Sequence, residues 1–224
     1  MKKTRITALM LCAAMLAGSC GTMNNTTKGG LIGGGSGAAA GAIIGGLLGK
    51  GKGAAIGAAV GAAVGTGTGV IIGRKMDKKA AEAAKIKGAQ VEQVTDINGL
   101  PAVKVSFPAG ILFGFNSSAL GAEAKTALND FAKILKDDAT TDIAIIGHTD
   151  KVGTYAANMK VSKNRAVSVE KYLQSCGVSA QQFKKVEGVA YDQYDEDKSA
   201  DQNRRVEVYM YASEQMIKNA EASK

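Results

Sequence analysis

Glycine recurs at every fourth position through much of the chain's first third. The series comprises Gly33, Gly37, Gly41, Gly45, Gly49, Gly53, Gly57, Gly61, Gly65, Gly69 and Gly73. Residues four apart lie on one ridge of an α-helix, so the series would leave a groove without side chains along that ridge. The residues between the glycines are largely apolar, unlike those of a flexible glycine-rich spacer. The repeat therefore predicts helices that can approach one another closely.

The repeat divides into two uncharged segments, residues 29–49 and 53–73, separated by Lys50 and Lys52. Each helix would be about 31 Å long, close to the thickness of a hydrocarbon core. Glycine weakens a helix by about 1 kcal/mol per residue relative to alanine, so the pair needs lipid or a protein partner. We expect a membrane-associated helical hairpin over residues 29–74. A soluble oligomerisation element, with homo-oligomer formation, and a disordered segment are the alternatives.

The N-terminus has the layout of a secretory signal peptide. Lys2, Lys3 and Arg5 precede the apolar run of residues 6–16, which is too short to span a bilayer. Residues 16–20, Leu-Ala-Gly-Ser-Cys, resemble a lipobox, although the aliphatic residue lies one place early and serine precedes the cysteine. We expect a signal peptide over residues 1–19, acylation of Cys20 and a lipidated linker over residues 20–28. Ordinary cleavage beside an incidental cysteine is the alternative.

The excess of positive over negative charge lies in the N-terminal part of the chain. The formal net charge is +8, but residues 91–224 carry 16 basic and 18 acidic residues, a balance of −2. A nucleic-acid-binding module would carry its basic patch on the folded part. The distribution therefore argues against a nucleic-acid partner.

Cysteine and histidine are too scarce in the second half for a disulfide framework or a zinc cluster. Cys176 is its single thiol, and His148 is the single histidine of the chain. We expect no metal and no cofactor.

Alternating strand and helix patterns follow the glycine series. Residues 75–90 read as a connecting helix, and residues 91–97 and 100–107 flank Asn98-Gly99, a type I′ hairpin signal. Further strands are predicted at residues 111–115, 142–147, 184–189 and 205–211, and helices at residues 123–137 and 161–176. With the last two strands adjacent, this order indicates an α+β fold, a two-layer α/β sandwich over residues 91–212. Residues 213–224 read as a polar tail.

Four motifs in this half resemble those of OmpA-like domains. They are Ile-Leu-Phe-Gly-Phe-Asn-Ser-Ser at residues 111–118, Gly-His-Thr-Asp-Lys-Val-Gly at 147–153, Asn158 with Val-Ser-Lys-Asn-Arg-Ala at 161–166, and Asn-Arg-Arg-Val-Glu-Val at 203–208. The glycine series likewise resembles the glycine zipper that precedes such a domain in some outer-membrane lipoproteins. Between Gly188 and Asn203 the chain departs from the family, because the segment is acidic and lacks the usual second glycine and proline.

The resemblance implies a binding site for the peptidoglycan stem peptide, commonly at meso-diaminopimelate. Asp150 and Arg165 stand where the family's pair stands, and could hold the ammonium and the carboxylate of that zwitterion. Thr149 and Asn158 are candidate second contacts, although Asn158 could equally brace the loop, and Arg204 is a candidate peripheral contact. The alternative is that Asp150 and Arg165 simply pair with each other or cap the helix. Phe113, Phe115 and Leu128 are assigned to the core.

A catalytic role is weighed for His148 with Asp150 and either Ser162 or Cys176. The sequence lacks a nucleophile elbow and a second base, so we expect no catalytic residue and assign His148 to shaping the loop. The expected protein is a lipid-anchored component of the outer membrane with its C-terminal domain in the periplasm, tethering the envelope to peptidoglycan. The alternative is a membrane-inserting or oligomerising glycine-zipper protein that uses the domain only as an anchor.

Overall fold

A computed structural model describes residues 67–96, 99–114 and 117–223. The expected signal peptide, Cys20, the linker and the glycine series up to Gly65 lie outside these residues. So do Asn98 of the predicted turn and Phe115. In the described part, no helix has the length and apolar character needed to cross a membrane.

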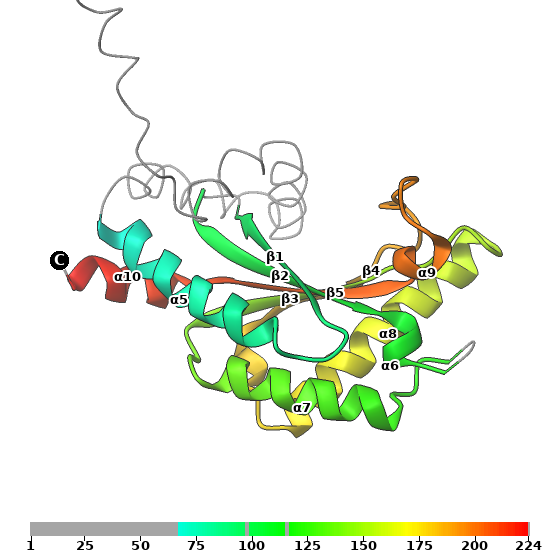
Figure 1. Cartoon of the computed structure of the whole chain (residues 1–224), viewed down its shortest axis with the longest axis horizontal. Coiled ribbons are helices and arrows are strands. Elements are labelled where there is room, and N and C mark those ends of the chain that lie inside the picture. The colour runs from blue at the N-terminus through cyan, green and yellow to red at the C-terminus, as the bar shows by residue number, and fades with distance from the viewer. Residues whose placement is uncertain (1–66, 97–98, 115–116, 224) are drawn as a thin grey trace, which may run out of the picture. The chain divides into compact units, whose positions relative to one another are not determined.

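The described residues form one five-stranded sheet with its main helices packed against one face (Figure 1). The strands are β1 (Gln90–Thr95), β2 (Pro101–Pro108), β3 (Thr141–Gly147), β4 (Phe183–Gly188) and β5 (Arg205–Ala212), in the order β1-β2-β5-β3-β4. The helices are α5 (Gly67–Ala83), α6 (Ala109–Leu112), α7 (Ala122–Lys136), α8 (Tyr155–Ser175), α9 (Ala200–Asn203) and α10 (Glu214–Ala222), with a 3₁₀ turn at Ala180–Gln182. The predicted α+β class and two-layer architecture are confirmed.

The main core fills the space between the sheet and the helices. Alternate residues of the strands, such as Val103, Val208 and Ile145, meet Phe131 and Leu128 of α7 there. Alternation places every second strand residue on this face, as the period of a β-strand requires. Leu128 is therefore a core residue, as predicted.

The last two strands are not neighbours, in contrast to the prediction. β5 lies between β2 and β3 and is antiparallel to both, whereas β4 pairs in parallel with β3 at the sheet edge. Helix α8 provides the crossover that a parallel pair requires. β5 is buried at almost every position, because a central strand is covered on both faces.

Four local predictions also differ from the structure. Residues 109–112 form helix α6 rather than a strand, since Pro108 ends β2 and a short apolar run fits either structure. Helix α8 begins before residue 161, because Thr154 caps it by accepting a hydrogen bond from the Ala157 N–H. The helix predicted to reach residue 90 ends at Ala83. Residues 214–222 form α10 rather than a tail, with Met216 and Ile217 buried.

Helix α5 belongs to the folded domain. It includes the last glycines of the period-four series and buries Ile72, Met76, Ala80 and Ala83 in the main core. These residues are three or four apart and therefore share one helix face.

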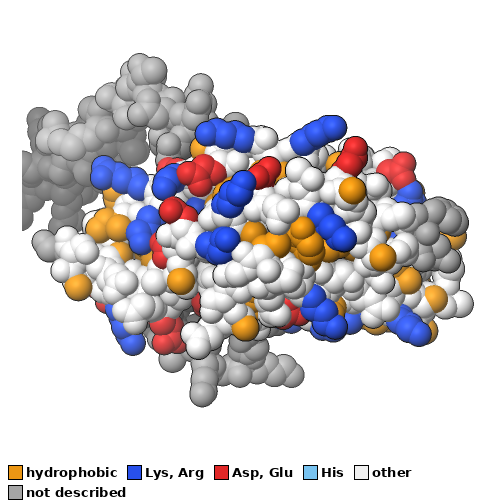
Figure 2. All heavy atoms as spheres, turned by 90° about the horizontal axis from the view of Figure 1, so that it is seen from below, with side chains coloured by type: hydrophobic (Ala, Val, Ile, Leu, Met, Phe, Trp, Pro, Cys, Tyr) orange, Lys and Arg blue, Asp and Glu red, His pale blue; other side chains and the backbone are white. Residues whose placement is uncertain are grey.

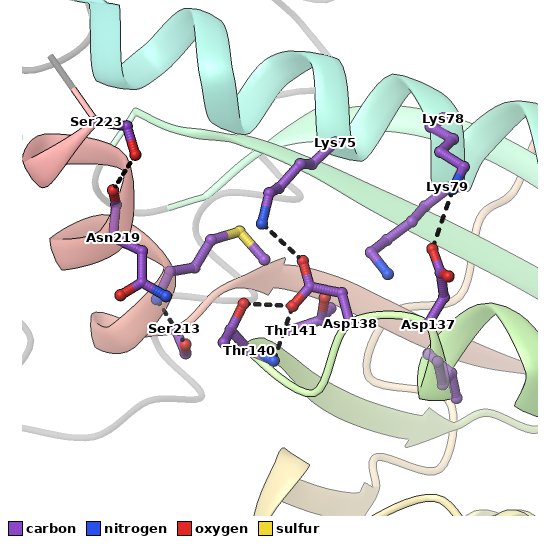
Figure 3. A network of polar contacts seen from close by, with 12 residues as sticks. Lys75, Lys78, Lys79, Asp137, Asp138, Thr140, Thr141, Ser213, Asn219 and Ser223 are labelled. Atoms are coloured by element: carbon purple, nitrogen blue, oxygen red, sulfur yellow. Dashed lines mark hydrogen bonds and ion pairs between the residues drawn. The ribbon is translucent and has the colours of Figure 1, made fainter.

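Polar contacts fix α5 to the end of α7 (Figure 3). Lys75 pairs with Asp138 at 3.0 Å and Lys78 with Asp137 at 3.1 Å. The buried ammonium of Lys79 donates to the Ile134 carbonyl at 3.1 Å, in the last turn of α7. A cation is favoured there because the carboxyl end of a helix carries partial negative charge.

Candidate ligand-binding site

Several chain segments meet at one end of the sheet. Pro108 at the end of β2 is paired with Arg205 at the start of β5, and Gly147 at the end of β3 is paired with Val206. The segments that follow β2 and β3 therefore lie beside the residue that precedes β5. Helix α8 begins at the same end, a few residues after β3.

These segments enclose a cavity of about 560 Å³. The residues that line it are Ala109, Gly110, Phe113, Gly114, Thr149, Asp150, Val152, Asn158, Val161, Arg165 and Arg204. All five residues that the sequence predicted for the non-covalent site are among them. The sequence analysis did not predict that Ala109, Gly110, Gly114 and Val152 line the cavity. For Val152, the available signal was its place between Asp150 and Gly153 in a loop.

Two glycines allow α8 to approach the sheet at this cavity. A Cβ on Gly147 would lie 2.1 Å from the Ser162 carbonyl oxygen, and one on Gly188 would lie 2.1 Å from the Lys163 nitrogen. Both distances are far below any van der Waals contact, so only glycine fits at these positions. The close approach brings Arg165, on the third turn of α8, to the loop that carries Asp150.

Asp150 is paired with Arg204 rather than with Arg165. Its Oδ2 accepts from the Arg204 guanidinium, and its Oδ1 accepts from the Val152 N–H at 3.0 Å. Within the described residues no ion pair joins Asp150 and Arg165. The alternative in which those two residues simply pair with each other is therefore wrong. The Asp150 side chain is largely buried, with 12% of its surface exposed, and it lines the cavity.

Arg165 is held by contacts with the segment between α6 and α7. Its Nε donates to the Ser117 carbonyl at 3.1 Å, and its guanidinium carbon lies 5.3 Å from the centre of the Phe113 ring. Burial lowers the pKa of Arg165, the nearby charge of Arg204 lowers it further, and Asp150 opposes both. Phe113, predicted as a core residue, is buried in the core and lines the cavity as well.

Asn158 and Thr149 shape the loop around Asp150. The Asn158 amide donates to the Val152 carbonyl at 2.9 Å, and Gly153 takes a φ of +93° that favours glycine. The Thr149 N–H donates to the Ala190 carbonyl at 2.9 Å, while its buried hydroxyl has no hydrogen-bond partner among the described residues. The bracing role considered for Asn158 is thus the one its contacts show.

The acidic segment between Gly188 and Asn203 borders the cavity. Asp201 forms an ion pair with the second terminal nitrogen of the Arg204 guanidinium. Glu196 forms an ion pair with Lys151, which lies in the same loop as Asp150. The buried Asn203 amide holds the segment together by donating to the carbonyls of Asp195, Lys198 and Ser199. The departure from the family pattern is therefore an ordered part of the site's rim.

His148 faces away from the cavity. Its Nε2 lies 3.1 Å from Glu207 Oε2, and Glu207 also accepts from Tyr209 at 2.7 Å and from Arg205 at 2.7 Å. Burial lowers the pKa of His148, against the hydrogen bond and the charge of Glu207, which raise it. The Ser162 hydroxyl donates instead to the Met159 carbonyl.

The Cys176 thiol lies 3.0 Å from the Asn129 side-chain oxygen. Among the described residues, His148, Ser162 and Cys176 thus each contact a different residue and not one another.

Charged side chains are dispersed over the helix-covered side of the domain (Figure 2). Lys and Arg side chains are scattered there among Asp and Glu side chains. The described residues contain no cluster of His, Cys, Asp and Glu that could hold a metal ion.

Comparison with known proteins gives two family matches. Residues 112–207 match the OmpA family, and residues 1–77 match the YMGG-like Gly-zipper. The chain is 34% identical over 117 residues to outer membrane protein A of Bordetella avium, covering 50% of this chain and 59% of that protein. It is 40% identical over 100 residues to the peptidoglycan-associated lipoprotein of Pseudomonas aeruginosa, covering 43% and 58%. The likeness thus spans little more than half of either relative.

Solved structures share the fold. A MotB-like protein from Desulfovibrio vulgaris superposes with a TM-score of 0.53 at 22% identity, covering 62% of this chain and 92% of that one. The cell wall anchor of the T6SS from Pseudomonas aeruginosa superposes with a TM-score of 0.50 at 23% identity, covering 62% and 97%. The chain thus contains a segment that matches the OmpA family, residues 112–207, and an N-terminal segment that matches the YMGG-like Gly-zipper, residues 1–77.

Proposed function

We propose that this protein binds peptidoglycan non-covalently through the cavity at Asp150 and Arg165, and so tethers the outer membrane to the cell wall. The observation that carries the proposal is the charge arrangement of the cavity, which presents one carboxylate and two guanidinium groups. An amino-acid end that bears both an ammonium and a carboxylate needs groups of both signs. The diaminopimelate of a stem peptide has such an end.

Each side chain has a distinct role in this proposal. Asp150 receives the ligand ammonium, and Arg165 binds the carboxylate through the nitrogens not engaged by Ser117. Arg204 neutralises Asp150 in the free protein and lies beside the incoming carboxylate. Charge-assisted contacts of about 1.5–3 kcal/mol each support weak binding by a single domain. Many tethered copies that face one polymer would bind more tightly through avidity.

The relatives support the same assignment. One of them is named a peptidoglycan-associated lipoprotein and another an outer membrane protein A. In line with the first name, we propose that Cys20 is acylated and anchors the chain in the outer membrane. The domain would then lie in the periplasm. Labelling with a radioactive fatty acid should mark the wild-type protein, and the label should be lost in Cys20→Ala.

The position of α5 suits a tether. A Cβ on Gly73 of α5 would lie 3.6 Å from the Pro101 side chain, at the first residue of β2, whereas the cavity lies beyond Pro108, the last residue. Helix α5 therefore begins at the end of the sheet remote from the cavity, and in Figure 1 its start lies opposite α6 and the start of α8. A domain held at one end can present the other to the wall.

The test is sedimentation of the full-length protein with purified sacculi in detergent. Asp150→Asn and Arg165→Gln are each expected to weaken binding by about 10- to 150-fold, since each removes one charge-assisted contact. Asp130→Asn and Arg74→Gln, which change exposed charges on α7 and α5, are the matched controls and should bind as the wild type does. Free meso-diaminopimelate should compete, whereas lysine blocked at its α-amino and α-carboxyl groups, which keeps only its side-chain ammonium, should not. Unchanged binding by both site variants would refute the assignment.

A further inference from the structure

Two exposed apolar side chains stand beside the cavity. Val152 has 78% of its surface exposed and Tyr155 has 43%, and with Val70 they are the large hydrophobic residues most exposed in the described part. Val152 lines the cavity. Tyr155 lies three residues before the cavity residue Asn158 on α8, so the two are neighbours on the helix surface. Exposed apolar groups that cluster at a binding site mark a contact surface.

The ring of Tyr155 is held in a fixed orientation. Its hydroxyl donates to Asp192 at 2.8 Å, and its ring packs edge-to-face on Tyr191, with centres 5.4 Å apart and planes at 82°. Beside it, the Lys151 ammonium lies 4.5 Å from the centre of the Tyr194 ring. These contacts come from the acidic segment in which the chain departs from its family. A rigid ring loses little conformational entropy when a ligand packs on it.

We propose that Tyr155 and Val152 form a glycan subsite, on which a sugar ring of the peptidoglycan strand packs while the stem peptide occupies the cavity. A sugar ring has an apolar face of C–H groups and a polar edge of hydroxyls. The ring of Tyr155 suits the face, and Asp192 and Lys151 beside it can bind hydroxyls. The proposal rests on the proposed function.

The chemistry of the ligand brings the sugar to this place. In a stem peptide, two residues separate diaminopimelate from the glycan, so an extended stem can place the sugar about 7–10 Å or more from the diaminopimelate residue. Val152 lines the cavity and lies three residues before Tyr155, the first residue of α8. The cavity and the proposed glycan subsite thus share Val152.

The experiment compares two probes on the full-length protein in detergent by calorimetry. One is the free tetrapeptide stem that contains meso-diaminopimelate, and the other is the same stem attached to its disaccharide. The wild type is expected to bind the disaccharide probe about threefold to tenfold more tightly, the size of one stacking contact. Tyr155→Ala should abolish this preference and leave the affinity for the free stem unchanged. Tyr155→Phe keeps the ring and should retain most of the preference.

Val70→Ala is the matched control, because it removes an exposed apolar side chain from the far end of the domain. It should leave both affinities unchanged. Equal affinity of the wild type for the two probes would overturn the glycan subsite and leave the proposed function intact. Failure of the wild type to bind either probe would overturn both. If Tyr155→Ala and Tyr155→Phe both weakened the binding of the two probes equally, Tyr155 would be assigned to supporting the cavity. That result would also overturn the subsite. Self-association of the wild type that Tyr155→Ala removes would assign the surface to a second copy instead.

Discussion

The guanidinium of Arg204 is paired with the carboxylate of Asp150, which lies 54 residues earlier in the chain. Its other terminal nitrogen is paired with Asp201, so Arg204 joins the Asp150 loop to the acidic segment. In the free protein this pairing neutralises the carboxylate that we assign to the ligand ammonium. The ligand must therefore share or displace the Arg204 contact, whereas Arg165 stays directed at the cavity.

Arg204→Gln is expected to act mainly on stability. The change leaves the largely buried Asp150 carboxylate without its ion-pair partner and should cost about 1–2 kcal/mol, since Arg204 itself is partly exposed. Binding to sacculi should fall less than in Arg165→Gln. Urea unfolding and sedimentation with sacculi measure the two effects. A loss of binding as large as that of Arg165→Gln would make Arg204 a principal ligand contact.

Gly147→Ala and Gly188→Ala are expected to push α8 away from the sheet. Each new methyl group would meet the α8 backbone, which cannot yield as a flexible side chain can. Overpacking of this kind costs about 1–3 kcal/mol, and here it should also weaken binding to sacculi because Arg165 moves with α8. Gly114→Ala is the matched control for stability only, since a Cβ there meets nothing within 4 Å but Gly114 lines the cavity. Wild-type stability in both variants would contradict the close approach.

Local patterns predicted where the helices and strands of the domain lie better than they predicted which strands pair with each other. The alternation of residues 205–211 identifies a strand, but no local feature states that β5 lies between β2 and β3. Strand order depends on which connections cross over, which is a property of the whole chain. Likewise, the run at residues 109–112 fits helix or strand until Pro108 ends β2.

The candidate site shows the same division. Motif resemblance brought five residues to one cavity, because motif order fixes which loops meet. It did not predict that Arg204 would pair with Asp150, since this ion pair depends on β3 and β5 being neighbours in the sheet, which no local pattern states. The role of α5 was also missed, because its apolar face follows directly on the glycine series and reads as a continuation of it.

Helix α5 is expected to be required for a stable domain. Ile72 and Met76 are fully buried, and burying each contributes about 1.5–3 kcal/mol. In urea unfolding, a fragment of residues 67–224 should therefore have a free energy of unfolding larger than that of residues 91–224. These two side chains alone should contribute about 3–6 kcal/mol of the difference. Ile72→Ala in the longer fragment should cost about 2–5 kcal/mol, whereas Val70→Ala on its exposed side should cost less than about 0.5 kcal/mol. Equal stability of the two fragments would show that α5 is only a connector.

Asp142 is expected to make stability depend on pH. Burial raises the pKa of this carboxyl to about 6, Lys184 at 3.6 Å opposes the rise, and Glu214 adds to it. A carboxyl whose pKa is raised by folding stabilises the protein in its protonated form, and that contribution is lost as pH rises through about 6. At pH 7.5 the folded protein therefore holds an ionised Asp142 at a cost. Asp142→Asn removes this cost and should stabilise the protein by about 1–2 kcal/mol at pH 7.5, after allowance for solvent screening.

The sign of the stability change in Asp142→Asn shows whether burial of Asp142 or its ion pair with Lys184 has the larger effect. If burial dominates, the gain from Asp142→Asn in urea unfolding shrinks at pH 4.5 and approaches zero only below pH 3.8, where the carboxyl is protonated in the unfolded chain as well. If the Lys184 pair dominates, Asp142→Asn destabilises the protein at pH 7.5 instead. Asp130→Asn is the control, because its exposed pair with Lys133 should contribute less than about 0.5 kcal/mol at either pH. Because Asp142 lies at the start of β3, remote from the cavity beyond Gly147, sacculus binding should be the same in both proteins at pH 7.5. A change in binding there would mean that the two ends of the strand are coupled.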